Sequence, residues 1–128
     1  MAVQYFEDLD CWKLGRELSK KIYAITKSDG FSKDYGLKDQ IRRAVVSIMT
    51  NVAEGYERGT NKDFSKFLYI ARGSAGEVRS LLYVALDQDY IKEADFENHQ
   101  NLCRRCSAVI YGLIKHLRSH NDWRTGQQ

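Results

Sequence analysis

The chain contains no proline among its 128 residues, and this absence constrains its fold more than any other feature. Proline removes a backbone hydrogen-bond donor and clashes with the preceding turn inside a helix, so long helices avoid it. A protein built from many short strands and turns usually contains several prolines. The composition therefore predicts an all-α protein.

Apolar residues recur at spacings of three and four along four segments, the pattern of a helix with one buried face. The segments span about 7–28, about 33–58, a stretch that begins after Thr60, and about 95–119. The residues expected on the four buried faces are Cys11, Leu14, Leu18, Ile22 and Ile25; Leu37, Ile41, Ala44, Val45, Ile48 and Val52; Phe64, Phe67, Leu68, Ala71, Ala75, Val78, Leu82 and Leu86; and Phe96, Cys103, Cys106, Ile110, Leu113, Ile114 and Leu117.

Short polar breaks separate these segments. Asp29-Gly30 is expected to end the first helix and Ser32 to cap the second, while Gly59 ends the second and Thr60 opens a capping box for the third. Short connections favour an antiparallel up-down-up-down four-helix bundle. We expect one domain over residues 1–128, with a frayed tail at about 121–128.

Composition excludes several classes of protein. Three cysteines, an odd number, and no charged-then-apolar start argue against a secreted disulfide scaffold. No run approaches the roughly 18 apolar residues that span a bilayer. These features predict a cytoplasmic protein that does not cross a membrane.

The chain contains few residue patterns that suggest catalysis or metal binding. Cys103-x-x-Cys106 and the pair His116 and His120 superficially resemble zinc-finger ligands. On one continuous helix, however, Cys106 and His116 lie about 15 Å apart at 1.5 Å per residue, too far for one tetrahedral ion. No phosphate-binding glycine loop or nucleophile–base pair is evident. We expect no metal, no cofactor and no enzymatic activity.

Basic residues provide a functional lead. The formal net charge is +3, a mild excess that an oligomer would multiply. Clustered cations neutralise phosphates and release counterions, which gives salt-sensitive and largely sequence-independent affinity. The alternative is a solvated surface on which nearby carboxylates cancel the field. The candidates for nucleic-acid binding are Arg42, Arg43, Arg58, Lys62, Lys66 and Arg72.

Two groups of residues are candidates for an oligomer interface. Leu9, Trp12 and Tyr23 widen the apolar arc of the first helix, although they could instead cover the end of the bundle. On the third helix, Gly73 and Gly76 share a face with the aromatic Tyr69. Mid-helix glycine costs about 1 kcal/mol relative to alanine, so we expect close packing there, within or between subunits, rather than merely tolerated glycines.

A polar stripe on the second helix lies opposite its apolar face. The stripe consists of Gln40, Arg43, Ser47, Asn51, Glu54 and Arg58. Asparagine and serine are poor helix formers. We therefore expect Ser47 and Asn51 to hydrogen-bond a neighbouring helix, a partner chain or a ligand.

Two stretches of the chain carry a family pattern. The first is Tyr35-Gly36-Leu37-Lys38-Asp39-Gln40-Ile41-Arg42-Arg43-Ala44, then Ser47-Ile48, then Asn51-Val52-Ala53-Glu54-Gly55 with Arg58. The second is Phe67-Leu68-Tyr69-Ile70-Ala71-Arg72-Gly73-Ser74-Ala75-Gly76-Glu77. Nearly the whole chain resembles the four-helix bundle proteins related to the 23S ribosomal RNA intervening-sequence protein. Met49 and Val52 depart from the family, which often has proline and isoleucine there. The signature positions are Asn51, Glu54, Gly55, Arg58, Ser74 and Glu77.

This resemblance implies a homopentamer without catalytic activity. Similar bundles serve as accessory proteins of diversity-generating retroelements, where they contact a reverse transcriptase and nucleic acid. The leading hypothesis is therefore a non-enzymatic oligomer that contacts RNA or DNA backbone through its basic surface. The alternative is a protein–protein adaptor or accessory subunit, for example of a reverse transcriptase, that does not itself bind nucleic acid. The resemblance leaves open whether the signature serves folding, assembly or binding.

Overall fold

The computed structural model describes residues 3–120, and every regular element within that range is helical. This confirms the all-α prediction. The elements are a short 3-10 helix η1 (Phe6–Asp8), α1 (Asp10–Ile25), α2 (Asp29–Lys33), α3 (Tyr35–Glu57), α4 (Asn61–Asp87) and α5 (Glu93–Arg118). The tail expected to fray lies outside the described residues.

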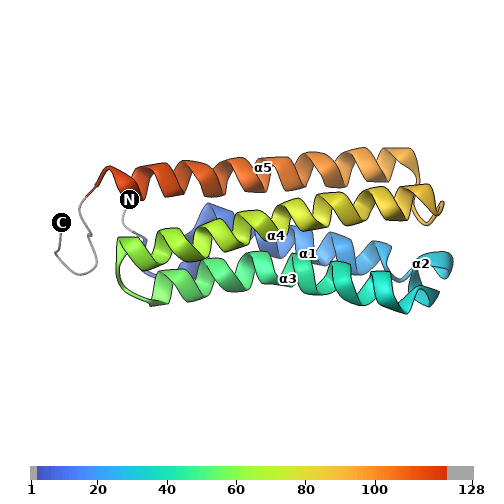
Figure 1. Ribbon diagram of the computed structural model, residues 1–128, viewed down its shortest axis with the longest axis horizontal. Coiled ribbons are helices and arrows are strands. Elements are labelled where there is room, and N and C mark those ends of the chain that lie inside the picture. Colours follow the sequence, from blue (N-terminus) through green and yellow to red (C-terminus); the bar gives the residue numbers. More distant parts are fainter. Residues whose placement is uncertain (1–2, 121–128) are drawn as a thin grey trace.

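The four long helices form an up-down-up-down bundle in which each runs antiparallel to the one before it (Figure 1). Helix α3 packs against both α1 and α4, and α5 packs against α4 and closes the bundle against α1. The connections that force this order are short, as expected for antiparallel neighbours. The predicted bundle is confirmed.

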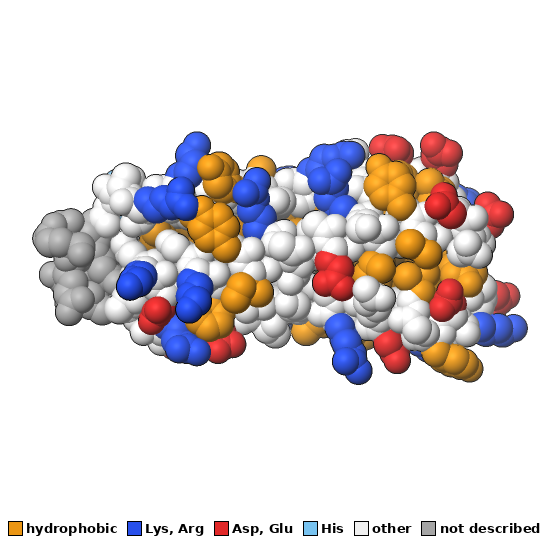
Figure 2. Space-filling model, in the orientation of Figure 1, with side chains coloured by type: hydrophobic (Ala, Val, Ile, Leu, Met, Phe, Trp, Pro, Cys, Tyr) orange, Lys and Arg blue, Asp and Glu red, His pale blue; other side chains and the backbone are white. Residues whose placement is uncertain are grey.

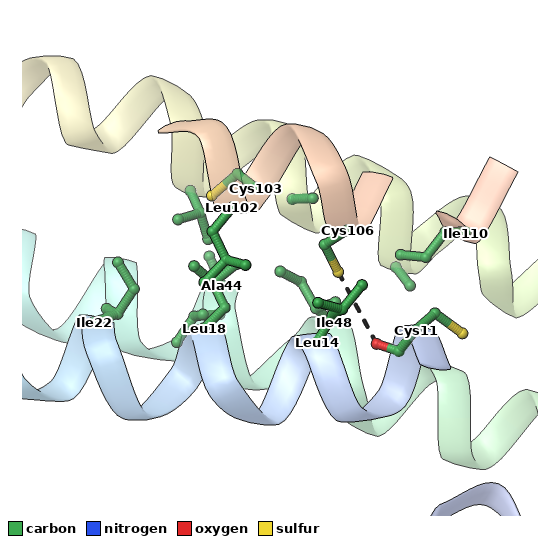
Figure 3. Packing of buried hydrophobic residues seen from close by; sticks show 14 of the residues in the cluster. Cys11, Leu14, Leu18, Ile22, Ala44, Ile48, Leu102, Cys103, Cys106 and Ile110 are labelled. Carbon is green, nitrogen blue, oxygen red and sulfur yellow. Dashed lines mark hydrogen bonds between the residues drawn. The ribbon is translucent and has the colours of Figure 1, made fainter. Parts of the chain in front are cut away.

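The core follows the predicted apolar faces. Residues from three of the helices meet in its centre, where Leu14 of α1 lies beside Ile48 of α3 and below Cys106 of α5 (Figure 3). Every residue expected on a buried face is buried, except for four that are half-buried: Ile25, Phe67, Leu86 and Leu113.

The three cysteines are free and belong to this core. Burial raises the pKa of the Cys11 and Cys103 thiols to about 12 and that of Cys106 to about 11. The Cys106 thiol points toward α1 and donates to the Cys11 carbonyl oxygen at 4.0 Å (Figure 3). The three cysteines therefore act as small apolar side chains, because burial disfavours the charged, reactive thiolate.

The connection between α1 and α3 differs from the prediction. Asp29 and Gly30 do not end a helix in the left-handed conformation; they begin the short helix α2. The cause lies in the next residue, because Phe31 is fully buried and stacks on the Tyr90 ring at 5.4 Å. Burying this ring holds the linking turn against the end of the bundle.

The cap of α3 also differs. Ser32 was expected to cap this helix but lies inside α2, where its hydroxyl donates to the Asp29 carbonyl oxygen at 3.0 Å. The cap is Asp34, whose Oδ1 accepts from the Leu37 amide at 3.1 Å. Its other oxygen accepts from the Tyr90 hydroxyl at 3.0 Å. Asp34 therefore caps α3 and also joins it to Tyr90, which follows α4.

Gly59 and Thr60 mark the break between α3 and α4 as predicted, although of the expected capping box only the Thr60 side-chain bond is recorded. Gly59 has a φ of 92°, the left-handed conformation in which glycine bears no steric cost. Thr60 then caps α4, because its hydroxyl accepts from the Asp63 amide at 3.2 Å.

Candidate nucleic-acid interface

The six basic residues proposed for nucleic-acid binding do not share one surface. Arg42 and Arg43 line a depression on the α1–α3 side together with Tyr23. Lys62, Lys66 and Arg72 lie on α4 beside α5, and Arg58 is at the end of α3. These six residues were grouped because they are close in sequence. In the folded bundle they lie on different surfaces.

Arg42 holds two helices together. Its Nε donates to the Thr26 hydroxyl at 2.8 Å, and its guanidinium lies 4.3 Å from the centre of the Tyr23 ring. Thr26 is fully buried at the end of α1, so this bond satisfies a hydroxyl that water does not reach. Arg42 therefore serves mainly the fold, and its neighbour Arg43 remains exposed.

Arg58 has its charge matched locally. Its guanidinium donates to Glu54 at 3.2 Å and lies 4.9 Å from the Phe67 ring centre. This pair is half exposed, and such surface pairs contribute about 0–1 kcal/mol. Arg58 and Glu54 thus offer little net charge to a polyanion.

A different set of cations gathers along the seam between α4 and α5. Two depressions adjoin there and share Tyr69. We call them together the α4–α5 groove, and its lining residues are Asn61, Lys62, Asp63, Ser65, Lys66, Tyr69, Arg72, Gly73, Gly76, Arg79, Ser107, Leu117 and Arg118.

The charge of the α4–α5 groove is strongly unbalanced. Five of its lining residues are cations, Lys62, Lys66, Arg72, Arg79 and Arg118, and Asp63 is its one carboxylate. Within the part of the chain that the structure describes, none of these cations forms a salt bridge. The stretch of α5 from 98 to 118 contains no Asp or Glu. On the face shown in Figure 2, acidic side chains gather mainly at one end of the bundle, and basic side chains predominate over the other half.

Two of these cations lie against tyrosine rings, Arg118 against Tyr69 and Arg72 against Tyr111. The Arg118 guanidinium lies 5.3 Å from the Tyr69 ring centre and donates to its hydroxyl. The Arg72 guanidinium lies 4.3 Å from the Tyr111 ring centre, and its Nε donates to the Ser107 hydroxyl at 3.3 Å. Each arginine therefore lies within the distance at which cation–π attraction to a ring acts.

The buried side-chain amide of Gln100 orients Arg79. Gln100 was not identified from the sequence. The Arg79 Nε donates to Gln100 Oε1 at 2.9 Å, and Gln100 Nε2 donates back to the Arg79 carbonyl oxygen at 2.8 Å. Gln100 is fully buried, so both polar ends of its side chain are satisfied by one residue of α4. No local sequence signal links these two positions, which are 21 residues apart.

Gly73 and Gly76 are exposed, and a Cβ atom added at either would meet nothing within 4 Å. They do not mediate close packing within the chain. Close packing occurs instead at Gly55, where a Cβ would lie 2.6 Å from Phe67 Cβ, and at Gly15, where it would lie 3.2 Å from Met49 Cβ. Packing of the Gly73–Gly76 face between subunits stays a prediction.

Two residues of the polar stripe, Gln40 and Ser47, hydrogen-bond α4. Ser47 and Ser74 share a hydrogen bond of 2.9 Å, and Asn51 Nδ2 donates to the Ser47 carbonyl and hydroxyl oxygens at 2.8 and 2.9 Å. Gln40 Nε2 donates to Glu77 Oε2 at 3.3 Å. Ser47 therefore hydrogen-bonds the neighbouring helix, whereas the recorded bonds of Asn51 are to Ser47 within α3.

The apolar residues of the first helix are largely used within the chain. Leu9 belongs to the core, with 8% of its surface exposed. Trp12 is half-buried, and its ring lies 5.4 Å from that of Phe6. This favours the alternative that both residues cover the end of the bundle. Tyr23 is exposed but shielded on one side by Arg42.

Among residues 3–120, no group of three or more His, Cys, Asp or Glu side chains is placed to hold a metal ion. His116 and His120 stack on one another, with ring centres 3.9 Å apart. None of the described helices combines the length and apolarity needed to cross a bilayer.

Comparisons with known proteins agree with the fold. The family model described as 23S rRNA-intervening sequence protein matches residues 7–112. A crystal structure of a protein of unknown function from the S23 ribosomal protein family of Bacteroides thetaiotaomicron is similar, with a TM-score of 0.76 and 23% identity over 82% of this chain and 95% of that one. No curated protein matches the chain.

Proposed function

Since the chain belongs to the 23S rRNA-intervening sequence protein family, we propose that it is a non-enzymatic binding protein that contacts the backbone of RNA or DNA. The site is the α4–α5 groove. It contains Lys62, Lys66 and Arg72 from the original candidates and adds Arg79 and Arg118.

The observation that carries this proposal is that five cations, none with a carboxylate partner among the described residues, line one groove beside a single carboxylate. A cation that already has a carboxylate partner must lose it to bind phosphate, whereas an unpaired cation exchanges only its counterion. Arg58 has such a partner in Glu54, and the groove cations have none among the described residues. The groove therefore offers a polyanion five neighbouring cations without a competing salt bridge.

Self-association strengthens the proposal. We propose a homo-oligomer, a pentamer by resemblance to the family, in which several grooves act on one nucleic acid. The single chain carries only +3, and copies of the groove side by side would raise both the field and the effective concentration of binding sites. Light scattering tests this part, and a monomer at micromolar concentration would contradict it.

Salt-dependent binding of labelled RNA tests the function. We expect the RNA to be retained at about 50 mM salt and lost at about 200 mM. Counterion release favours binding, and its contribution falls as the salt concentration rises. The double variant Lys66→Glu with Arg118→Glu should weaken binding and flatten the salt dependence. Its matched control is Lys20→Glu with Lys21→Glu, which makes the same change of charge on exposed residues of α1.

The outcomes are distinct. Binding that falls in the groove variant and persists in the control supports the site. Equal loss in both variants would indicate a diffuse electrostatic effect without a defined groove. No retention at about 50 mM salt would refute nucleic-acid binding altogether.

An adaptor or accessory subunit, for example of a reverse transcriptase, is the second candidate. Tyr83 and Val84 on α4 expose 49% and 43% of their surfaces, and exposed apolar area often marks a protein interface. This function predicts a stable complex with a partner protein and no binding of free RNA. Replacing both residues by serine should then abolish the complex while leaving the groove unchanged.

A further inference from the structure

Tyr69 in the α4–α5 groove and Tyr111, which contacts the groove residue Arg72, add a property that phosphate binding does not require. Unpaired bases stack on aromatic rings and on arginine guanidinium planes, whereas a duplex keeps its base faces covered. We propose that the groove binds single-stranded nucleic acid by stacking bases on the Tyr69–Arg118 and Tyr111–Arg72 pairs. This inference rests on the proposed function and names the form of its ligand.

The geometry of the two pairs suits stacking. Each joins a ring of one helix to a guanidinium of the other, since Tyr69 and Arg72 belong to α4 and Arg118 and Tyr111 to α5. The pairs therefore bridge the seam. Tyr69 leaves 41% of its surface exposed although Arg118 contacts it, so an open surface remains for a base.

Cations flank the stacking pairs on both sides. Lys62 and Lys66 precede Tyr69 along α4, and Arg79 follows Arg72. From Lys62 to Arg79 the helix extends about 25 Å at 1.5 Å per residue. At about 3.4 Å per stacked nucleotide, this length accommodates at most about seven nucleotides. The groove thus matches a short single strand with its phosphates on the flanking cations.

The two exposed glycines allow the strand to approach closely. Between Tyr69 and Arg79 the outer face of α4 carries Gly73 and Gly76, and no atom lies within 4 Å of the place a Cβ would occupy. A strand held by the stacking pairs therefore meets no bulky side chain there, and its binding excludes packing of this same face between subunits.

The test compares strands with the wild-type protein and matched variants. The probe is an RNA of about twelve nucleotides carrying 2-aminopurine, a base whose fluorescence falls when it stacks, used alone and annealed to its complement. Tyr69→Ser removes the ring, Tyr69→Phe retains it, and Tyr35→Ser is the control at an exposed tyrosine outside the groove. Circular dichroism verifies that each variant is folded.

We expect tighter binding of the single strand than of the duplex, with quenching. Tyr69→Ser should weaken single-strand binding about 5- to 160-fold, the range for losing one base–aromatic stack. Tyr69→Phe should retain both affinity and quenching, and so should Tyr35→Ser.

The remaining results separate the two proposals. Equal affinity for both forms, with no effect of Tyr69→Ser, would overturn the stacking inference and leave salt-dependent backbone binding standing. Failure of the wild-type protein to bind either form would overturn both.

Discussion

The side-chain oxygens of Ser47 and Ser74 lie 2.9 Å apart and join α3 to α4 by a hydrogen bond. Asn51 donates to the same Ser47 hydroxyl at 2.9 Å. Ser74 and Asn51 are signature positions of the family resemblance, as is Gly55, which lets the two helices approach closely. Much of the signature therefore maintains the α3–α4 contact, whatever further role it has.

Replacing Gly55 with alanine should destabilise the protein. The new Cβ would lie 2.6 Å from Phe67 Cβ, an atom fixed to the backbone of α4. We expect a loss of about 1–3 kcal/mol in the free energy of unfolding, as for other overpacked contacts. Urea denaturation measures it, and a variant as stable as the wild type would show that α3 and α4 separate at little cost.

Replacing Gly73 with alanine should have the opposite effect. A Cβ there meets open space, and alanine is favoured in a helix by about 1 kcal/mol. Urea denaturation should show a gain of up to that amount. A loss of stability at concentrations where the protein assembles would instead place another subunit against this face of α4.

Replacing Ser47 with alanine should cost more than replacing Ser74. The Ser47 hydroxyl contacts both Ser74 and Asn51, whereas Ser74 has only the Ser47 hydroxyl as a recorded partner. A hydrogen bond contributes about 1 kcal/mol, so we expect roughly 1 kcal/mol for Ser74→Ala and more for Ser47→Ala. A double-mutant cycle measures the coupling between the two serines; effects that simply add would show that they act independently.

Stability should decline in alkaline solution because of the buried thiols. An exposed cysteine has a pKa near 9.0, and burial raises the pKa of Cys103 to about 12. The unfolded chain therefore loses the thiol proton first, so stabilisation present below pH 9 is lost as the pH rises from 9 toward 12. Urea denaturation at several pH values measures the decline. Cys103→Ala should reduce its slope, and an unchanged slope would assign the decline to other groups.

The helices and their buried faces could be predicted because they are local properties. Residues three and four apart share a face of any helix, so Leu37, Ile41 and Ile48 identify one core face without knowledge of the fold. Gly59 and Thr60 are likewise local signals. Helix α2 was missed because Phe31 is buried by Tyr90, a contact between residues far apart in the chain.

The sequence by itself determined that this protein is a bundle of four amphipathic helices, since the helical repeat orders apolar side chains wherever each helix is placed. Only the tertiary structure decided which exposed charges share a surface. Arg72 and Arg118 are far apart in sequence yet line one groove, while Arg42 and Lys66 lie on different sides. The physical reason is that a surface between helices depends on which helices are neighbours and on how each is rotated about its axis.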